Sequence, residues 1–419
     1  MPHTVVTYTS WGERLRSACC GVCFGIILFL GSFPLLVWNE GRSIQRYESL
    51  EEGRKNVVVV ADPTASIDRS REGMLVYMSG KAEAGADAAA VSDTTFGVSP
   101  SNILKLKRVA EMYQWEESSS SHTTKTEGGG TRTETTYSYH KTWSDHLIKS
   151  ASFSDSSHEN PSSMPYTSQI FLADPIVLGS YTLSNGLVGK INWFSDWTND
   201  GSLSVDNIDD DYAHQTAIVY DNGFYMGSSP GSPEVGDMKI SFKYIPEGTV
   251  SLVAAQTGET FTSYVTKRGG SLLLLRSGYH TADDLFLLAE RDNVVITWLV
   301  RFAGFIIMYM GLKMVSQPLE VVLDRIPLIG RFAGDIMGGA TSLVTCIVAA
   351  ALSILTIAIA WLAYRPLLTF TLFAIVAGLV YFAKNRVDVN RHGTEIPMVK
   401  ATPIFTDAEP SAPPRDGFV

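Results

Sequence analysis

The stretch ACCGVCFGIILFLGSFPLLVW, residues 18–38, carries no charged side chain. At 1.5 Å per residue, a helix of this length spans about 30 Å, the thickness of a bilayer's hydrocarbon core. Arg14 and Arg16 precede it, and no small-residue cleavage site follows, because the chain continues with Asn39 and Glu40. We therefore expect an uncleaved transmembrane helix over residues 18–38, not a signal peptide.

Three further apolar stretches lie near the end of the chain. They predict transmembrane helices over residues 293–313, 336–364 and 367–383. Arg365 and Pro366 separate the last two, and proline cannot continue a helical hydrogen-bond ladder, so they mark a tight turn. The sequence thus predicts an α-helical membrane protein with four transmembrane helices, one N-terminal and three C-terminal.

Basic residues concentrate on one side of this arrangement. They flank the first span, fill the loop between the second and third spans, and follow the fourth: Arg14, Arg16, Lys313, Arg325, Arg331, Lys384, Arg386, Arg391. The positive-inside rule then places the tail 1–17, an amphipathic loop 314–335 and a disordered tail 384–419 in the cytoplasm. Residues 39–292 fall on the opposite side, in a lumen or outside the cell.

The long segment 39–292 reads as a folded domain rich in strands. It holds 21 Lys and Arg against 34 Asp and Glu, a net charge of −13, and no cysteine. Runs of β-branched and alternating residues predict strands over 57–60, 74–79, 103–116, 131–143, 238–244, 249–255, 260–266 and 271–276. The Ser-, Thr- and Gly-rich stretch 117–130 predicts a mobile hairpin tip, and 281–289 a short helix. We expect a large β-rich α+β domain.

Composition and motifs exclude several functions. The whole chain has a net charge of −10, which disfavours direct nucleic-acid binding, because that needs clustered Lys and Arg. There is no Gly-x-Ser-x-Gly elbow and no phosphate-cradling loop with a lysine. His140 and His146 lack nearby cysteine or further ligands for zinc. We expect no catalytic residues, no metal site and no cofactor.

Apart from Lys313 at the end of the second span, Arg301 is the one charged residue inside a predicted span, and intramembrane ionisable residues are functional candidates. Its side chain points toward the helix N-terminus, so the guanidinium reaches toward the luminal edge. There Glu40 or another carboxylate can pair with it and form a structural anchor. The alternative is a pore-lining role in an oligomeric channel or transporter.

Glycines and cysteines supply the remaining candidate residues. Gly21 and Gly25 form a GxxxG spacing in the first span, and Gly330, Gly334 and Gly338 repeat it before the third. Such spacing lets helices approach closely, either within one chain or between copies in an oligomer. Cys19 and Cys20, at the cytoplasmic edge of the first span, are candidates for palmitoylation or simply buried apolar thiols.

Five short strings occur in a fixed order along the chain. They are Asn39–Arg42, Glu111–Glu116, His158–Ser162, Pro233–Asp237 and Trp361–Pro366. With the layout of one span followed by three, residues 18–386 resemble the LUMA family, also called the transmembrane protein 43 family.

The resemblance implies a membrane protein of the endoplasmic reticulum and inner nuclear membrane. Such proteins oligomerise and help to organise the nuclear envelope. Nuclear-envelope membrane proteins and lamin-type proteins are the implied partners, besides the lipid bilayer itself. The family has no catalytic residues to carry over to this chain.

Overall fold

The computed structural model describes residues 3–126, 128–198, 203–323 and 330–364, and the single positions 371 and 378. For 323, 330–338 and 340 it describes the backbone alone. The chain divides into two compact units, Met1–Ala360 and Trp361–Val419. All that follows concerns the first unit and the last turn of the helix that leaves it.

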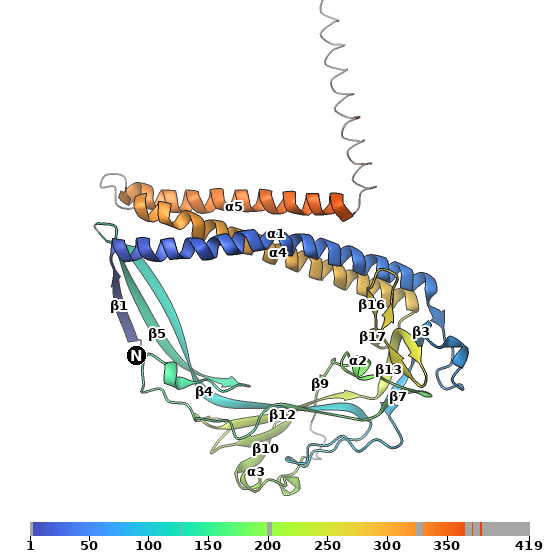
Figure 1. The fold of residues 1–419 in the computed structure, drawn as a ribbon. Coiled ribbons are helices and arrows are strands. Elements are labelled where there is room, and N and C mark those ends of the chain that lie inside the picture. Colours follow the sequence, from blue (N-terminus) through green and yellow to red (C-terminus); the bar gives the residue numbers. More distant parts are fainter. Residues whose placement is uncertain are drawn as a thin grey trace, which may run out of the picture. The chain divides into compact units, whose positions relative to one another are not determined.

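Three long helices contain the first three predicted spans. Helix α1 (Trp11–Asn56) and helix α4 (Ala282–Leu323) run antiparallel and side by side, and α5 (Gly330–Tyr364) follows (Figure 1). All three are long and apolar enough to cross a membrane. The fourth predicted span, 367–383, and the tail 384–419 lie outside the described residues, apart from positions 371 and 378.

The first two helices extend well beyond their predicted boundaries. Ser10 caps α1 and forms a capping box with Glu13, so the helix begins seven residues before the apolar stretch. Past Trp38 it continues through charged turns to Asn56, and α4 likewise begins within the expected domain, at Ala282. Helices α1 and α4 thus extend past the expected span boundaries at residues 17, 38 and 292, because capping and helix-to-helix packing, not hydropathy, set where the helices stop.

One sheet of the domain is centred on a long hairpin. Its strand order is β1 (His3–Thr9), β5 (Thr131–Ser144), β4 (Ile103–Lys125), β12 (Met238–Pro246), β11 (Gly223–Met226) and β10 (Ala217–Tyr220). Strand β6 (Gln169–Leu172) also pairs with β4, and β9 (Ser195–Asp196) with β12. In the inner half of β4, Leu104, Leu106, Ala110 and Met112 are fully buried at alternate positions and pack in the main core with Phe242.

A second sheet joins the domain to the helices. Its order is β14 (Thr260–Thr262), β13 (Gly248–Thr257), β3 (Leu75–Ala84), β7 (Ile176–Leu178) and β8 (Tyr181–Thr182), with β17 (Leu274–Ser277) on β13 and β2 (Val58–Val59) on β3. Beside it lie the pair β15 (Tyr264–Val265) and β16 (Ser271–Leu272). The domain also contains two short α-helices, α2 (Asn185–Val188) and α3 (Asp211–Thr216), and three single-turn 3-10 helices, Arg69–Arg71, Ser150–Ser152 and Val205–Asn207. Leu50 of α1 and Phe286 of α4 pack on this sheet in a shared core. The β-rich α+β domain is thus confirmed.

The expected mobile tip at residues 117–130 is instead mostly strand. Strand β4 continues to Lys125, which pairs with Thr131 of β5. Hydroxyl pairs join the two strands, with Ser121 Oγ 2.9 Å from Thr135 Oγ1 and Thr123 Oγ1 3.0 Å from Thr133 Oγ1. Serine and threonine were interpreted as loop-forming, yet facing each other across a ladder they stabilise it.

The N-terminal segment is a further difference. Strand β1 pairs with the outer half of β5, and the Arg14 guanidinium donates to the carbonyl of Gly129 at the hairpin turn. The sequence predicts residues 1–17 and the domain on opposite membrane faces. An open strand pair cannot form through a hydrocarbon layer, because its unpaired backbone groups find no partner there. Residues 1–17 therefore cannot lie on the opposite membrane face from the domain while β1 is paired with β5 of the same molecule.

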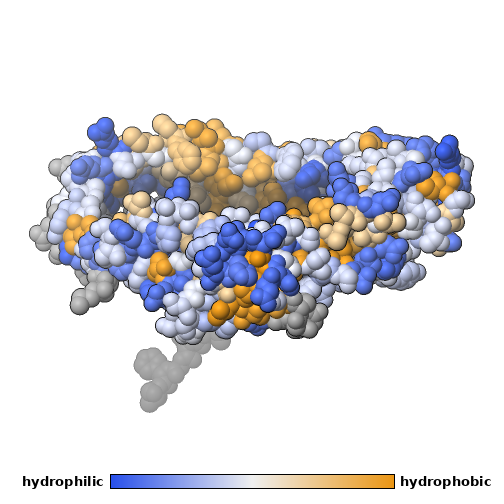
Figure 2. Space-filling model, turned by 90° about the horizontal axis from the view of Figure 1, so that it is seen from below, coloured by the Kyte–Doolittle hydropathy of each residue, from blue (hydrophilic) through white to orange (hydrophobic). Residues whose placement is uncertain are grey.

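The outer face of the first sheet carries an apolar patch at its edge. Figure 2, which looks onto this face, shows hydrophobic side chains gathered at its centre within a largely hydrophilic surface. Strand β10 ends the sheet here, and its Ile218 and Val219 are exposed. An edge strand with exposed apolar side chains is a surface on which another chain can pair.

Candidate functional site

A buried polar cluster joins α1 to α4 at the domain end of their apolar sections. Its centre is the ion pair between Arg301 and Glu40, with Nε to Oε1 and Nη2 to Oε2 both at 2.7 Å. Glu40 is only 1% exposed, so the carboxylate lies wholly within protein. Of the carboxylates that the sequence offers to Arg301, the structure therefore selects Glu40, two and three residues before Arg42 and Ser43.

Two parallel hydrogen bonds join Arg301 to Glu40, and this bidentate geometry determines the strength of the ion pair. A guanidinium and a carboxylate joined by two parallel hydrogen bonds form a stronger and more directional pair than a lysine could. The Arg301 guanidinium also lies 4.8 Å from the ring centre of Trp298, one turn earlier on α4. Removing one partner of such a buried pair leaves an uncompensated charge and costs about 3–5 kcal/mol.

Hydrogen bonds from Arg42 and between neutral groups extend the cluster by one turn. Arg42 donates to Asn293 Oδ1 at 3.1 Å and to Thr297 Oγ1 at 3.0 Å. In return Asn293 donates to the backbone carbonyl of Ser43 at 2.9 Å, and Asn39 donates to that of Thr297 at 3.1 Å. Because each of these four hydrogen bonds crosses from one helix to the other, the cluster fixes the register between α1 and α4.

At the opposite end of the apolar sections, glycines set the distance between the same two helices. A Cβ on Gly25 would lie 2.8 Å from Met314 Cβ and 2.9 Å from the carbonyl oxygen of Gly311. The predicted GxxxG of Gly21 and Gly25 thus faces α4, although Gly21 itself has only looser contacts, at 3.7 Å and beyond. Two further glycines of α4, Gly311 and Gly304, also lie at this interface, and Leu36 of α1 packs against Gly304. The sequence did not point to them, because which residues of α1 face them is known only from the packed helices.

The other predicted residues stay apart from this cluster. Gly330, Gly334 and Gly338 lie in the first turns of α5, whose side-chain surroundings fall outside the described residues. Cys19 and Cys20 are free, and both lie on the exposed surface of α1. Their lipidation stays a prediction.

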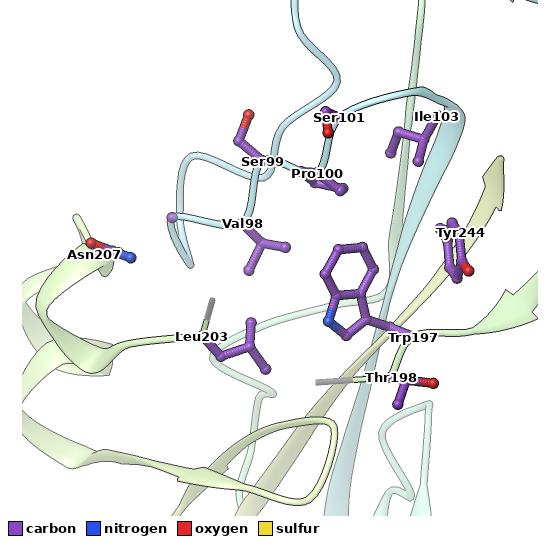
Figure 3. A pocket seen from close by; sticks show the side chains of 11 residues that line it. Val98, Ser99, Pro100, Ser101, Ile103, Trp197, Thr198, Leu203, Asn207 and Tyr244 are labelled. Atoms are coloured by element: carbon purple, nitrogen blue, oxygen red, sulfur yellow. The ribbon is translucent and has the colours of Figure 1, made fainter. Parts of the chain in front are cut away.

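The domain also contains a neutral cavity of about 550 Å³ (Figure 3), lined by Trp197, Tyr244, Asn207, Leu203 and residues 97–101. The residues that line it include no acid, base or histidine. Within residues 3–364 as far as they are described, no three His, Cys, Asp or Glu side chains are grouped to hold a metal ion. The polar cluster between α1 and α4 is therefore the arrangement from which function is best argued.

Comparison with known proteins gives one consistent family. The family model described as "Transmembrane protein 43" matches residues 112–366. The human protein "Transmembrane protein 43" is 34% identical over 390 residues, covering 90% of this chain and 93% of its own length. The Drosophila melanogaster "Transmembrane protein 43 homolog" is 29% identical over 387 residues, covering 91% of this chain and 99% of its own. No solved structure matches.

Proposed function

Because the chain belongs to the transmembrane protein 43 family, we propose that it is a non-enzymatic, multi-pass scaffold of the endoplasmic reticulum and inner nuclear membrane. The β-rich domain lies in the lumen in this proposal, and the protein organises nuclear-envelope complexes. The location and the partners follow from the family resemblance. Nuclear-envelope membrane proteins and lamin-type proteins are the proposed partners, and no nucleic acid, cofactor or metal is involved.

The observation that carries the scaffold role is the locked pair of helices. A scaffold must hold its domain rigidly relative to the membrane, so that bound partners are held too. The Arg301–Glu40 ion pair and the hydrogen bonds of Arg42 fix the two helices that enter the domain. Leu50 and Phe286 then join those same helices to the second sheet. The membrane anchor and the domain thus move as one body.

Self-association is the second part of the proposal. Strand β10 presents Ile218 and Val219 at the free edge of the first sheet. A second copy that pairs along this edge would cover apolar area and satisfy edge hydrogen bonds together. We propose a homo-oligomer built through this edge.

The channel alternative has less support from the same residues. A pore-lining arginine presents its charge to water, whereas Arg301 is neutralised by the nearly inaccessible Glu40. The pair holds α1 to α4, which suits an anchor. We therefore prefer the scaffold.

The test is localisation of a C-terminally tagged chain in cells under selective permeabilisation. Antibodies to the tag and to the domain are applied after opening the plasma membrane alone, and again after opening all membranes. The proposal predicts a nuclear-rim and reticular signal, with the domain reached only in the second condition. A plasma-membrane signal, or a domain reached in the first condition, would contradict it.

A further inference from the structure

A second cavity lies where the helix pair meets the domain. It measures about 420 Å³ and is lined by α1, α4, β17 and the residues that follow α2. Its charged lining residues are Arg42 and Arg46 of α1, Lys190, Arg276 and Asp292. Four cations therefore face one carboxylate, in a domain whose net charge is −13 by its 21 basic and 34 acidic residues.

The one carboxylate is already engaged. Asp292 forms an ion pair with Arg276, which leaves three cations in the cavity. The Arg42 guanidinium donates to neutral groups, and its Nε is buried without an acceptor among the described residues. Arg46 donates to the carbonyl oxygen of Ser271 at 2.6 Å. Lys190 is exposed at the rim and has no ion pair with a carboxylate in the described part of the chain.

Such an excess of positive charge is costly without a counter-charge. Like charges near one another repel, and a partly buried guanidinium loses hydration. An anion with several acceptor oxygens would offset both effects, since guanidinium groups form paired hydrogen bonds with phosphate. The basic part of the cavity is thus suited to a phosphate group.

The apolar part of the cavity points to the source of that phosphate. Leu273, Leu274 and Leu275 line the domain side, and Ile296 of α4 lines the membrane side. Ile296 lies within the predicted span 293–313 and is 47% exposed. Trp38 and Trp298 are both more than half exposed. They lie close in sequence to the cavity-lining residues Arg42 of α1 and Ile296 of α4. Indole side chains collect at the interface of a bilayer, so the cavity lies at the depth of lipid headgroups.

We propose that this cavity binds the phosphate of an anionic membrane lipid. Arg42, Arg46 and Lys190 hold the headgroup, and the acyl chains continue past Ile296 along the exposed apolar surface of α4. The bound lipid offsets part of the charge of the three cations and joins α1, α4 and the second sheet. This goes beyond the proposed scaffold role and depends only on the chain being embedded in a membrane.

The test is thermal unfolding of the purified full chain in detergent with added lipid. Dioleoyl phosphatidylserine, dioleoyl phosphatidylcholine and inorganic phosphate are titrated separately, because a ligand of the folded state raises Tm. We expect phosphatidylserine to raise Tm in a saturable way, and phosphatidylcholine and phosphate to do so only weakly. Stabilisation by inorganic phosphate equal to that by phosphatidylserine would overturn the lipid assignment, and no stabilisation by either would overturn the site.

Substitutions in the cavity test whether the rise in Tm caused by phosphatidylserine comes from binding at this site. Lys190→Gln changes an exposed rim residue and should fold normally, but weaken the apparent affinity for phosphatidylserine about tenfold, the effect of losing one charge-assisted hydrogen bond. Arg46→Gln should do the same, with a lower basal Tm. The matched control is Arg268→Gln, which removes an exposed cation of the same domain that pairs with Glu48. Equal affinity in Lys190→Gln and wild type would contradict the proposal.

Discussion

Glu40 and Arg301 are 261 positions apart in the chain, yet their side chains form a two-point ion pair within the interface between α1 and α4. The pair joins α1, just past the first predicted span, to the second predicted span in α4, although the whole domain lies between them in the sequence. It therefore brings the two ends of the domain segment together, at the point where α1 and α4 pass from their predicted spans into the domain. The rigid anchoring proposed for the scaffold depends on this closure.

Close approach of the two helices should depend on Gly25. In Gly25→Ala the new methyl group would meet Met314 Cβ at 2.8 Å and the Gly311 carbonyl oxygen at 2.9 Å. We expect a loss of about 1–3 kcal/mol in the free energy of unfolding, as for other overpacked sites. The control is Gly31→Ala on the same helix, where a Cβ has no neighbour within 4 Å. Equal Tm values for the two variants in detergent would refute the tight contact.

Much of the fold could be predicted because its signals are local. Hydropathy located three of the long helices, and alternation located strands such as 103–116 and 131–143. The full length of α1 and α4 could not be predicted, because the two helices stabilise each other beyond the apolar stretches through contacts such as Arg54 with Glu290 at 2.7 Å. Such contacts are invisible to a pattern within one segment.

The sequence predicted Arg301 and its possible partner Glu40, but not the other residues of the candidate site. Arg301 is conspicuous as a charge among apolar residues, and Glu40 was one of several carboxylates within reach. The roles of Asn293, Thr297 and Arg42 depend on which helix faces which, and at what register. The basic cavity was missed because its four cations come from three separate segments of an acidic domain.

The buried lysine of β4 gives a test within the domain. Lys105 is 7% exposed and its Nζ donates to the carbonyl oxygens of Val188 and Ile191 at 2.7 and 2.8 Å. Lys105→Met should cost about 1–3 kcal/mol of unfolding free energy, because the carbonyls lose their donor. Lys149→Met, at an exposed position, is the control and should change Tm little.

The same lysine predicts a pH dependence. Burial lowers the pKa of Lys105 in the folded state below its ordinary value. Between that lowered pKa and the ordinary value of about 10.4, the unfolded chain binds more protons, so stability rises with pH. Wild type should therefore gain stability relative to Lys105→Met as pH rises toward this value. Unfolding is measured for both chains at rising pH. If the stability of wild type minus that of Lys105→Met stays constant or shrinks, the burial of Lys105 is contradicted.

Pairing of the N-terminal strand can be tested by cross-linking. Thr4 Oγ1 lies 3.3 Å from Thr136 Oγ1, so Thr4→Cys with Thr136→Cys should form a disulfide under mild oxidation. The background chain has Cys19, Cys20, Cys23 and Cys346 replaced by serine. Thr4→Cys with Ser118→Cys is the control, since Ser118 pairs elsewhere, with Ser138. No cross-link, and an N-terminal tag reached after opening the plasma membrane alone, would favour the predicted cytoplasmic tail.

Oligomer formation should depend on the edge of the first sheet. Ile218→Lys with Val219→Lys places two charges on exposed positions of β10 and should reduce the oligomer size in detergent. Folding should be preserved because neither side chain is buried. Met74→Lys, at another exposed apolar position, is the control. An unchanged mass by light scattering would exclude this edge as the contact.

The central claim is that Arg301 and Glu40 hold α1 and α4 together, and a double-mutant cycle measures that coupling directly. Unfolding free energies are compared for wild type, Arg301→Leu, Glu40→Leu and the double variant, with Arg291→Leu as an exposed control on α4. We predict that each single change costs about 3–5 kcal/mol and that the double variant costs no more than one of them, because a lone buried charge is the main penalty. Additive losses, or single variants as stable as wild type, would contradict the account.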